Sequence, residues 1–177
     1  VEVIPVDKIV PDEFYTADII IGASSNGKVL DVSKFRPGTI LVDDSFPPVV
    51  DAKKAILRMK NERDVIFVGA GKLDVGKKER VIIQNAVPES WIRQSIEKFG
   101  DEGLPGCQAE SLLMGFDNSL PPTIGLVSDK NAAQYWTKAN ELNLGAVGFH
   151  LQGFQIDKSL LEKIKNLQKK KYGQIGK

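Results

Sequence analysis

A continuous apolar run, Ala17-Asp18-Ile19-Ile20-Ile21-Gly22-Ala23, lies early in this 177-residue chain and stops at the turn cluster Ser24-Ser25-Asn26-Gly27. An unbroken apolar run of this length is typical of a strand buried on both faces, as in a parallel sheet. Two more such runs follow, Thr39-Ile40-Leu41-Val42-Asp43 and Val65-Ile66-Phe67-Val68-Gly69. Short strands that alternate with helices or loops predict an α/β fold with a parallel sheet.

The segments between these runs fit that fold. Residues 30–35 predict a short helical turn, and Asp51 is in position to cap a helix over residues 52–59. In parallel sheets, ligands bind beyond the carboxyl ends of the strands. We therefore expect the turns at Ser24, Asp43 and Gly69 to line one crevice.

After residue 83 the short apolar runs give way to apolar residues at helical spacing. Apolar residues at helical spacing predict helices over 88–99, 107–116, 130–144 and 160–167, with Gly145 as the C-cap of the third. We predict a Rossmann-like parallel sheet over residues 1–85, the second half of such a domain, and a mostly helical segment over 86–177 packed on it. The opening Val1-Glu2-Val3-Ile4-Pro5-Val6 reads as a strand already under way, so we expect a fragment, or a front half that lies outside this chain.

Composition limits the classes of function. The net charge is +1, which gives no global electrostatic case for nucleic acid or for a membrane surface. No apolar run approaches the ~20 residues that span a bilayer, and no secretion signal is visible. A single cysteine cannot form an internal disulfide, which favours a reducing, cytoplasmic location.

Several familiar sites are missing from the sequence. No Gly-x-Gly-x-x-Gly follows a strand, and there is no phosphate-binding P-loop. The run Gly69-Ala70-Gly71 lacks the third glycine and the ribose-binding acid of the dinucleotide fingerprint, so by itself it indicates a structural turn. One His and one Cys without clustered ligands predict no metal site, and His150 reads as a packed or partly exposed residue.

The single cysteine stands in the run Cys107-Gln108-Ala109-Glu110-Ser111-Leu112-Leu113, directly after the turn Leu104-Pro105-Gly106. A thiol at a helix N-terminus lies where the backbone dipole favours the reactive thiolate. Cys107 is therefore a candidate nucleophile. The other interpretation is a small buried hydrophobe, because free Cys is among the most buried residue types.

The order of segments resembles the second half of the long-chain acyl-(acyl-carrier-protein) reductases of the cyanobacterial type, over about residues 15–155. The most specific motif is Cys107-Gln108-Ala109-Glu110-Ser111, which is similar to the reactive-cysteine segment of that family, Cys-x-Ala-Glu-Ser. The run Ile40-Leu41-Val42-Asp43-Asp44-Ser45-Phe46-Pro47 resembles a strand of the family that ends in Asp, two small residues, an aromatic and Pro. The run 17–24 and the turn Val68-Gly69-Ala70-Gly71 match more general features of Rossmann dehydrogenases.

The resemblance implies an NADP-dependent reductase that converts acyl thioesters to aldehydes through an acyl group bound to Cys107. Its substrate would be a thioester of acyl carrier protein or CoA. Glu110 would orient the thiol or relay a proton, or else be a first-turn acid that complements the helix dipole. The residues that would contact the nicotinamide end of NADP are Ser24, Ser25, Asn26, Asp43, Gly69 and Gly71.

The sequence also departs from the family pattern. Members carry a Glu-His pair soon after the glycine-rich turn, where this chain reads Lys72-Leu73-Asp74-Val75. Lys72 and Asp74 are the residues that could substitute for that pair. Because no phosphate-binding half is visible, we expect an incomplete dinucleotide site, no activity of the chain alone, and an apolar sheet edge that is either exposed or covered by a partner.

A second class of function stays open at this point. The chain could be a Rossmann-like dehydrogenase relative, similar to shikimate dehydrogenase or glutamyl-tRNA reductase, or a non-catalytic domain. In either case Cys107 would be a packed structural residue. Such relatives share the strand and turn near Ser24, but they give no reason for the Cys-x-Ala-Glu-Ser run.

Overall fold

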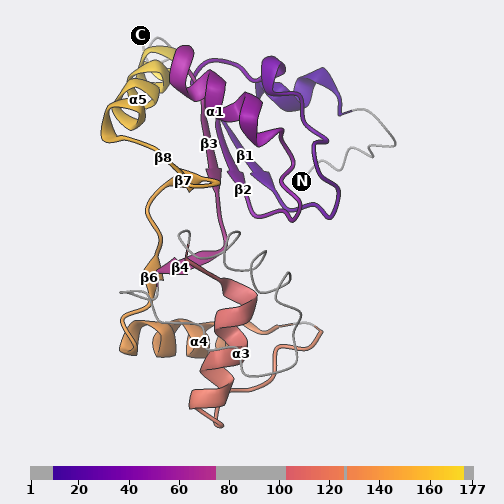
Figure 1. The fold of residues 1–177 in the computed structure, drawn as a ribbon, viewed down its shortest axis with the longest axis vertical. Coiled ribbons are helices and arrows are strands. Elements are labelled where there is room, and N and C mark those ends of the chain that lie inside the picture. Colours follow the sequence, from indigo (N-terminus) through magenta and orange to yellow (C-terminus); the bar gives the residue numbers. More distant parts are fainter. Residues whose placement is uncertain (1–9, 75–102, 126, 174–177) are drawn as a thin grey trace, which may run out of the picture. The chain divides into compact units, whose positions relative to one another are not determined.

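The computed structural model describes residues 10–74, 103–125 and 127–173. The chain divides into two compact units, each of which we describe by itself (Figure 1). The sheet unit comprises residues 1–70 and 148–177, and the cysteine unit comprises residues 71–147.

The sheet unit is built on three parallel strands, β1 (Ile19–Gly22), β2 (Ile40–Asp43) and β3 (Ile66–Gly69), in the order β1-β2-β3. All three predicted strands are present, so the predicted α/β fold with a parallel sheet is confirmed. The register pairs Ile20 with Leu41, and Leu41 with Phe67, which sets these three side chains in a row on one face of the sheet. All three are buried.

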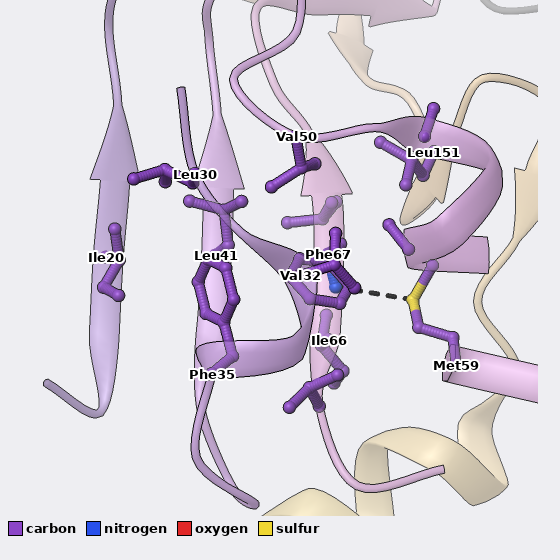
Figure 2. Close-up of a cluster of buried hydrophobic side chains, with 14 of the residues drawn as sticks. Ile20, Leu30, Val32, Phe35, Leu41, Val50, Met59, Ile66, Phe67 and Leu151 are labelled. Atoms are coloured by element: carbon purple, nitrogen blue, oxygen red, sulfur yellow. Dashed lines mark hydrogen bonds between the residues drawn. The ribbon is translucent and has the colours of Figure 1, made fainter. Parts of the chain in front are cut away.

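The connections between the strands cover this face (Figure 2). The short 3-10 helix η2 (Val32–Lys34) links β1 to β2, and the ring of Phe35 directly after it packs edge-on against Phe67 at 4.9 Å between centroids. Helix α1 (Ala52–Asn61) links β2 to β3, and its Met59 sulfur accepts a hydrogen bond from the Phe67 amide. The predicted cap is confirmed, because the Asp51 carboxylate accepts the amides of Lys53 and Lys54.

A buried arginine ties these connections together. Arg58 of α1 donates to the backbone carbonyls of Val32 at 2.5 Å and Phe35 at 2.7 Å. It also forms a two-point ion pair with Asp64, just before β3, with N–O distances of 3.0 and 3.1 Å. One side chain therefore satisfies two carbonyls of the β1–β2 connection and holds α1 beside the start of β3.

The last helix, α5 (Lys158–Tyr172), belongs to the sheet unit and lies along the amino ends of its strands. Polar contacts join α5 and its N-cap to residues that precede each strand. Asp157 pairs with Arg63, and Lys163 donates to the Glu62 carbonyl. Gln168 donates to the Gly38 carbonyl, and Lys171 and Tyr172 donate to the Asp18 carboxylate. Hydrogen bonds from Lys171 and Tyr172 lower the pKa of Asp18. The buried Leu160 and Ile164 join the same core as the sheet.

The remaining elements of the sheet unit are short. The 3-10 helix η1 (Asp12–Thr16) precedes β1, and a hairpin of β7 (His150–Leu151) and β8 (Phe154–Gln155) leads into α5. Leu151 is buried in the main core, and β7 packs against β3. The predicted boundary at residue 85 therefore differs from the observed units, because residues 148–173 return to the sheet.

The cysteine unit holds a small antiparallel sheet and two helices. Strand β4 (Lys72–Asp74) lies between β5 (Leu104–Pro105) and β6 (Gly145–Ala146). Helix α3 (Gly106–Phe116) and helix α4 (Asp129–Glu141) pack around Leu113, Leu120 and Ala139. Both helices were predicted, whereas the helix predicted over 88–99 lies outside the described residues. The prediction of Gly145 as a C-cap is wrong, since the C-cap of α4 is Leu142 and Gly145 pairs with Asp74 of β4.

Replacing Arg58 tests its role in the sheet unit. We expect Arg58→Ala to lower the free energy of unfolding by about 3–5 kcal/mol, because it leaves Asp64 and two carbonyls without their buried partner. Urea unfolding followed by circular dichroism measures the change. The control is Lys53→Ala, an exposed residue on the same helix, which we expect to cost less than about 0.5 kcal/mol. Equal effects of the two substitutions would contradict the assigned role.

Candidate functional site

The carboxyl ends of the three parallel strands lie side by side. The register pairs Gly22 with Asp43, and Asp43 with Gly69. The amide of Ala70 donates to the Asp43 carbonyl at 2.8 Å, so the chain leaving β3 stays next to the end of β2. The turns after β1 and β3 therefore begin at the same end of the sheet, as the sequence predicts.

The Asp43 carboxylate organises this end of the sheet. It is buried, and its two oxygens accept the backbone amides of Ser45 at 3.1 Å and Val49 at 2.9 Å. The hydroxyl of Ser45 in turn accepts the amide of Ser24 at 2.8 Å, which joins the turn after β1 to the turn after β2. We therefore assign Asp43 a positioning role in place of the predicted direct contact with a cofactor.

Gly22 is required by this network. A Cβ at this position would lie 2.8 Å from the Asp43 carboxylate and 3.0 Å from the Val49 side chain. The Asp43 carboxylate is held by the amides of Ser45 and Val49, and the Val49 side chain is buried in the core. A side chain at residue 22 would therefore push the two turns apart.

The two turns also pair along their backbones further on. Lys28 N donates to Pro48 O and Leu30 N donates to Val49 O, each at 2.9 Å. This pairing holds the two turns against each other along residues 28–30 and 48–49. Of the predicted cofactor residues here, Ser25 and Asn26 are exposed, whereas Ser24 and Gly69 are half-buried.

Cys107 lies in the first turn of α3, and its side chain is exposed. The interpretation of Cys107 as a packed core residue is therefore wrong. The N-cap of α3 is Pro105, whose side chain makes no hydrogen bond to the amides of the first turn. The preceding Gly106 donates its amide to the carbonyl of Gly71 at 2.7 Å, which places the predicted Gly71 beside the start of the helix.

Glu110 is half-buried, and its carboxylate acts on Tyr135 of α4. Burial and the nearby Glu110 carboxylate raise the pKa of Tyr135 in α4, whose hydroxyl donates to the Pro121 carbonyl. Cys107 and Glu110 thus lie one turn apart on one helix, Cys107 exposed and Glu110 half-buried. Ser111, one turn after Cys107, donates its hydroxyl to the Cys107 carbonyl at 3.4 Å.

The predicted residues fall into two groups. Gly71, Cys107 and Glu110 belong to the cysteine unit, together with Lys72 and Asp74 of β4. The other candidates, Ser24, Ser25, Asn26, Asp43 and Gly69, belong to the sheet unit. Sequence reasoning assigned no role to Ser45, although the Asp-x-Ser spacing after a strand is the signal of a carboxylate that accepts the amide two residues on.

Replacing Asp43 by asparagine tests the hydrogen bonds that join the turns at the carboxyl end of the sheet. We expect Asp43→Asn to lower the free energy of unfolding by about 1–3 kcal/mol, because its amide nitrogen would face the amide of Ser45 or Val49, donor against donor. Urea unfolding measures the cost. The matched control is Asp44→Asn at the exposed neighbouring position, with an expected change below about 0.5 kcal/mol. If Asp43→Asn left the free energy of unfolding unchanged, the two hydrogen bonds would not be what holds the turns.

The described residues show neither a membrane helix nor a metal cluster. No helix among them is both long and apolar enough to cross a bilayer. Within residues 10–74, 103–125 and 127–173, no three His, Cys, Asp or Glu side chains gather closely enough to hold a metal ion.

Comparison with protein-family models, with curated proteins and with solved structures finds no match to this chain.

Proposed function

We propose that this chain carries the catalytic cysteine of an NADP-dependent reductase that converts acyl thioesters to aldehydes. The observation that supports the proposal is the exposed Cys107 thiol in the first turn of α3, within a Cys-x-Ala-Glu-Ser segment. The second class of function, in which Cys107 serves only packing, gains no support from an exposed side chain.

The position of Cys107 suits attack on a thioester. Amides at a helix N-terminus favour negative charge on a nearby thiolate and on the oxygen of a carbonyl under attack. The Cys107 sulfur forms a bond to the acyl carbon, the thioester C–S bond breaks, and the carrier or CoA thiol leaves with a proton. Exchange of one thioester for another costs little free energy, and the acyl-enzyme divides a difficult reduction into two steps.

Reduction requires a hydride, which a bound reduced nicotinamide would supply to the acyl carbon as the bond to Cys107 breaks and the aldehyde leaves. The described residues fit one end of such a cofactor. Ser25 and Asn26 present exposed polar side chains beyond the end of β1, and Gly69 ends β3 without a side chain. None of the described turns has the glycine-rich form that binds a pyrophosphate, so these residues would hold the nicotinamide end only.

Two roles remain for Glu110 in the proposal. From the turn after Cys107 its carboxylate can orient the thiol, or it can relay a proton between solvent and the leaving thiol. Lys72 and Asp74 of β4 lie in the same unit, in the part of the sequence where the resembling family carries its Glu-His pair. They are the candidates for any further proton transfer.

Mass spectrometry tests the nucleophile without the cofactor. We expect the chain to gain one acyl group on Cys107 when it is incubated with a long-chain acyl-CoA, and Cys107→Ser to gain none, because a hydroxyl has a far higher pKa than a thiol. The matched control is Ser111→Ala, an exposed change one turn along the same helix, which should leave acylation intact. Circular dichroism checks that all three proteins are folded.

Two results would contradict the proposal. One is an acyl adduct on a residue other than Cys107. The other is equal adduct formation by the Cys107→Ser protein. Either result would remove the covalent role of the thiol while leaving the described fold unchanged.

A further inference from the structure

The dipeptide Asn26-Gly27 in the turn after β1 carries the groups for a reaction within the chain itself. The amide nitrogen of the residue after an asparagine can attack the asparagine side-chain carbonyl and close a five-membered imide. Groups held next to each other react far faster than separate molecules, and glycine leaves this nitrogen without a neighbouring side chain. Whether a fold permits the reaction depends on the exposure of the asparagine and on the hydrogen bonding of the next amide.

Both conditions are met at Asn26, which is exposed. Its own amide donates to the Ser24 hydroxyl at 3.0 Å, and the amide of Lys28 donates to the Pro48 carbonyl at 2.9 Å. Between them, the Gly27 amide donates to no acceptor among the described residues. The turn thus holds the amides on either side and leaves the reactive one without a partner.

Packing allows only glycine after Asn26. A Cβ at residue 27 would lie 2.7 Å from Cγ of Pro47 and 3.3 Å from the carbonyl oxygen of Pro48. The Pro48 carbonyl is itself held by the Lys28 amide, so it cannot move aside without a loss of that hydrogen bond. The reactive dipeptide is therefore built into the contact between the two turns.

The other asparagines of the described residues are each followed by a hydrogen-bonded amide. Three precede an amide that donates to a backbone carbonyl, and two lie inside α4 and α5, where the helix holds the next amide. Asn118 is exposed in a loop, but the next amide, of Ser119, donates to the Asp117 carboxylate at 3.0 Å. The six residues are Asn61, Asn118, Asn131, Asn140, Asn143 and Asn166.

We infer that Asn26 is a site of spontaneous deamidation in the folded chain. The Gly27 nitrogen forms a bond to the side-chain carbonyl carbon of Asn26, and the side-chain nitrogen leaves as ammonia with the Gly27 amide proton. Water then opens the imide at one of its two C–N bonds. Breaking the bond to the side-chain carbonyl gives aspartate, and breaking the bond to the main-chain carbonyl gives isoaspartate.

The two products affect the turn differently. Aspartate adds a negative charge at an exposed position and leaves the main chain unchanged. Isoaspartate adds one carbon to the main chain between two held points, the Ser24 amide on the Ser45 hydroxyl at 2.8 Å and the Lys28 amide on the Pro48 carbonyl at 2.9 Å. We expect isoaspartate to weaken these hydrogen bonds, which join the turn after β1 to the turn after β2.

Peptide mapping by mass spectrometry tests the inference on the full chain, incubated at mildly alkaline pH both folded and in urea. We expect the ratio of conversion at Asn26 to conversion at Asn118 to be about fivefold larger in the folded chain, because only there does a hydrogen bond restrain the Ser119 amide. Asn26→Gln is the control and should yield no isoaspartate at this position. A ratio that is no larger in the folded chain, or no conversion of Asn26 there, overturns the inference.

Asn26→Asp separates the new charge from the altered main chain. Its urea midpoint should match that of the unmodified chain, because the position is exposed. The incubated chain, enriched in isoaspartate, should unfold at a lower urea concentration. Equal midpoints of the incubated chain and the variant would overturn the expected effect on the turn. Acylation of Cys107 is scored independently, so its failure would remove the proposed function and leave the deamidation site standing.

Discussion

The buried Asp43 carboxylate is the interaction on which the carboxyl end of the sheet depends. Its two hydrogen bonds, to the amides of Ser45 and Val49, fold the chain after β2 back over the strand. That turn brings the Ser45 hydroxyl to the amide of Ser24, and it leaves room only for glycine at residue 22. The exposure of Ser25 and Asn26 follows, because the residues on either side of them are held and they form the free tip of the turn.

Different contacts stabilise the two ends of the sheet. At the amino end, α5 joins the starts of the strands through contacts from Asp157 to Tyr172, and Arg58 binds two carbonyls and Asp64. A hydrogen bond from Arg63 lowers the pKa of Asp157, so that carboxylate stays charged at its helix N-terminus. The contacts of α5 and Arg58 thus stabilise the amino end of the sheet, whereas the hydrogen bonds of Asp43 hold the turns at the carboxyl end.

Local signals account for what could be predicted from the sequence. The three apolar runs and the Asp51 cap depend on residues that are neighbours in the chain, and the structure confirms them. The β7–β8 hairpin and the return of α5 to the sheet depend on tertiary contacts, such as Leu151 in the main core, which leave no periodic pattern in two-residue strands. Gly145 was misassigned because its role is decided by pairing with Asp74, about 70 residues away. The hydrogen bonds of Asp43 to the turn that follows it were not predicted, because a strand-end aspartate looks the same in sequence whether it faces a ligand or its own turn.

Burial accounts for some residues of the α3 sequence and not for others. Ala109 and Leu113 are buried, and Leu113 belongs to the small core of the cysteine unit, so packing explains both. Cys107 and Ser111 are exposed, and burial in this unit does not require a thiol or a hydroxyl at either position. Packing therefore explains the apolar half of the Cys-x-Ala-Glu-Ser run and leaves the thiol unexplained. The proposed role of Cys107 as a nucleophile would account for an exposed thiol at the start of a helix.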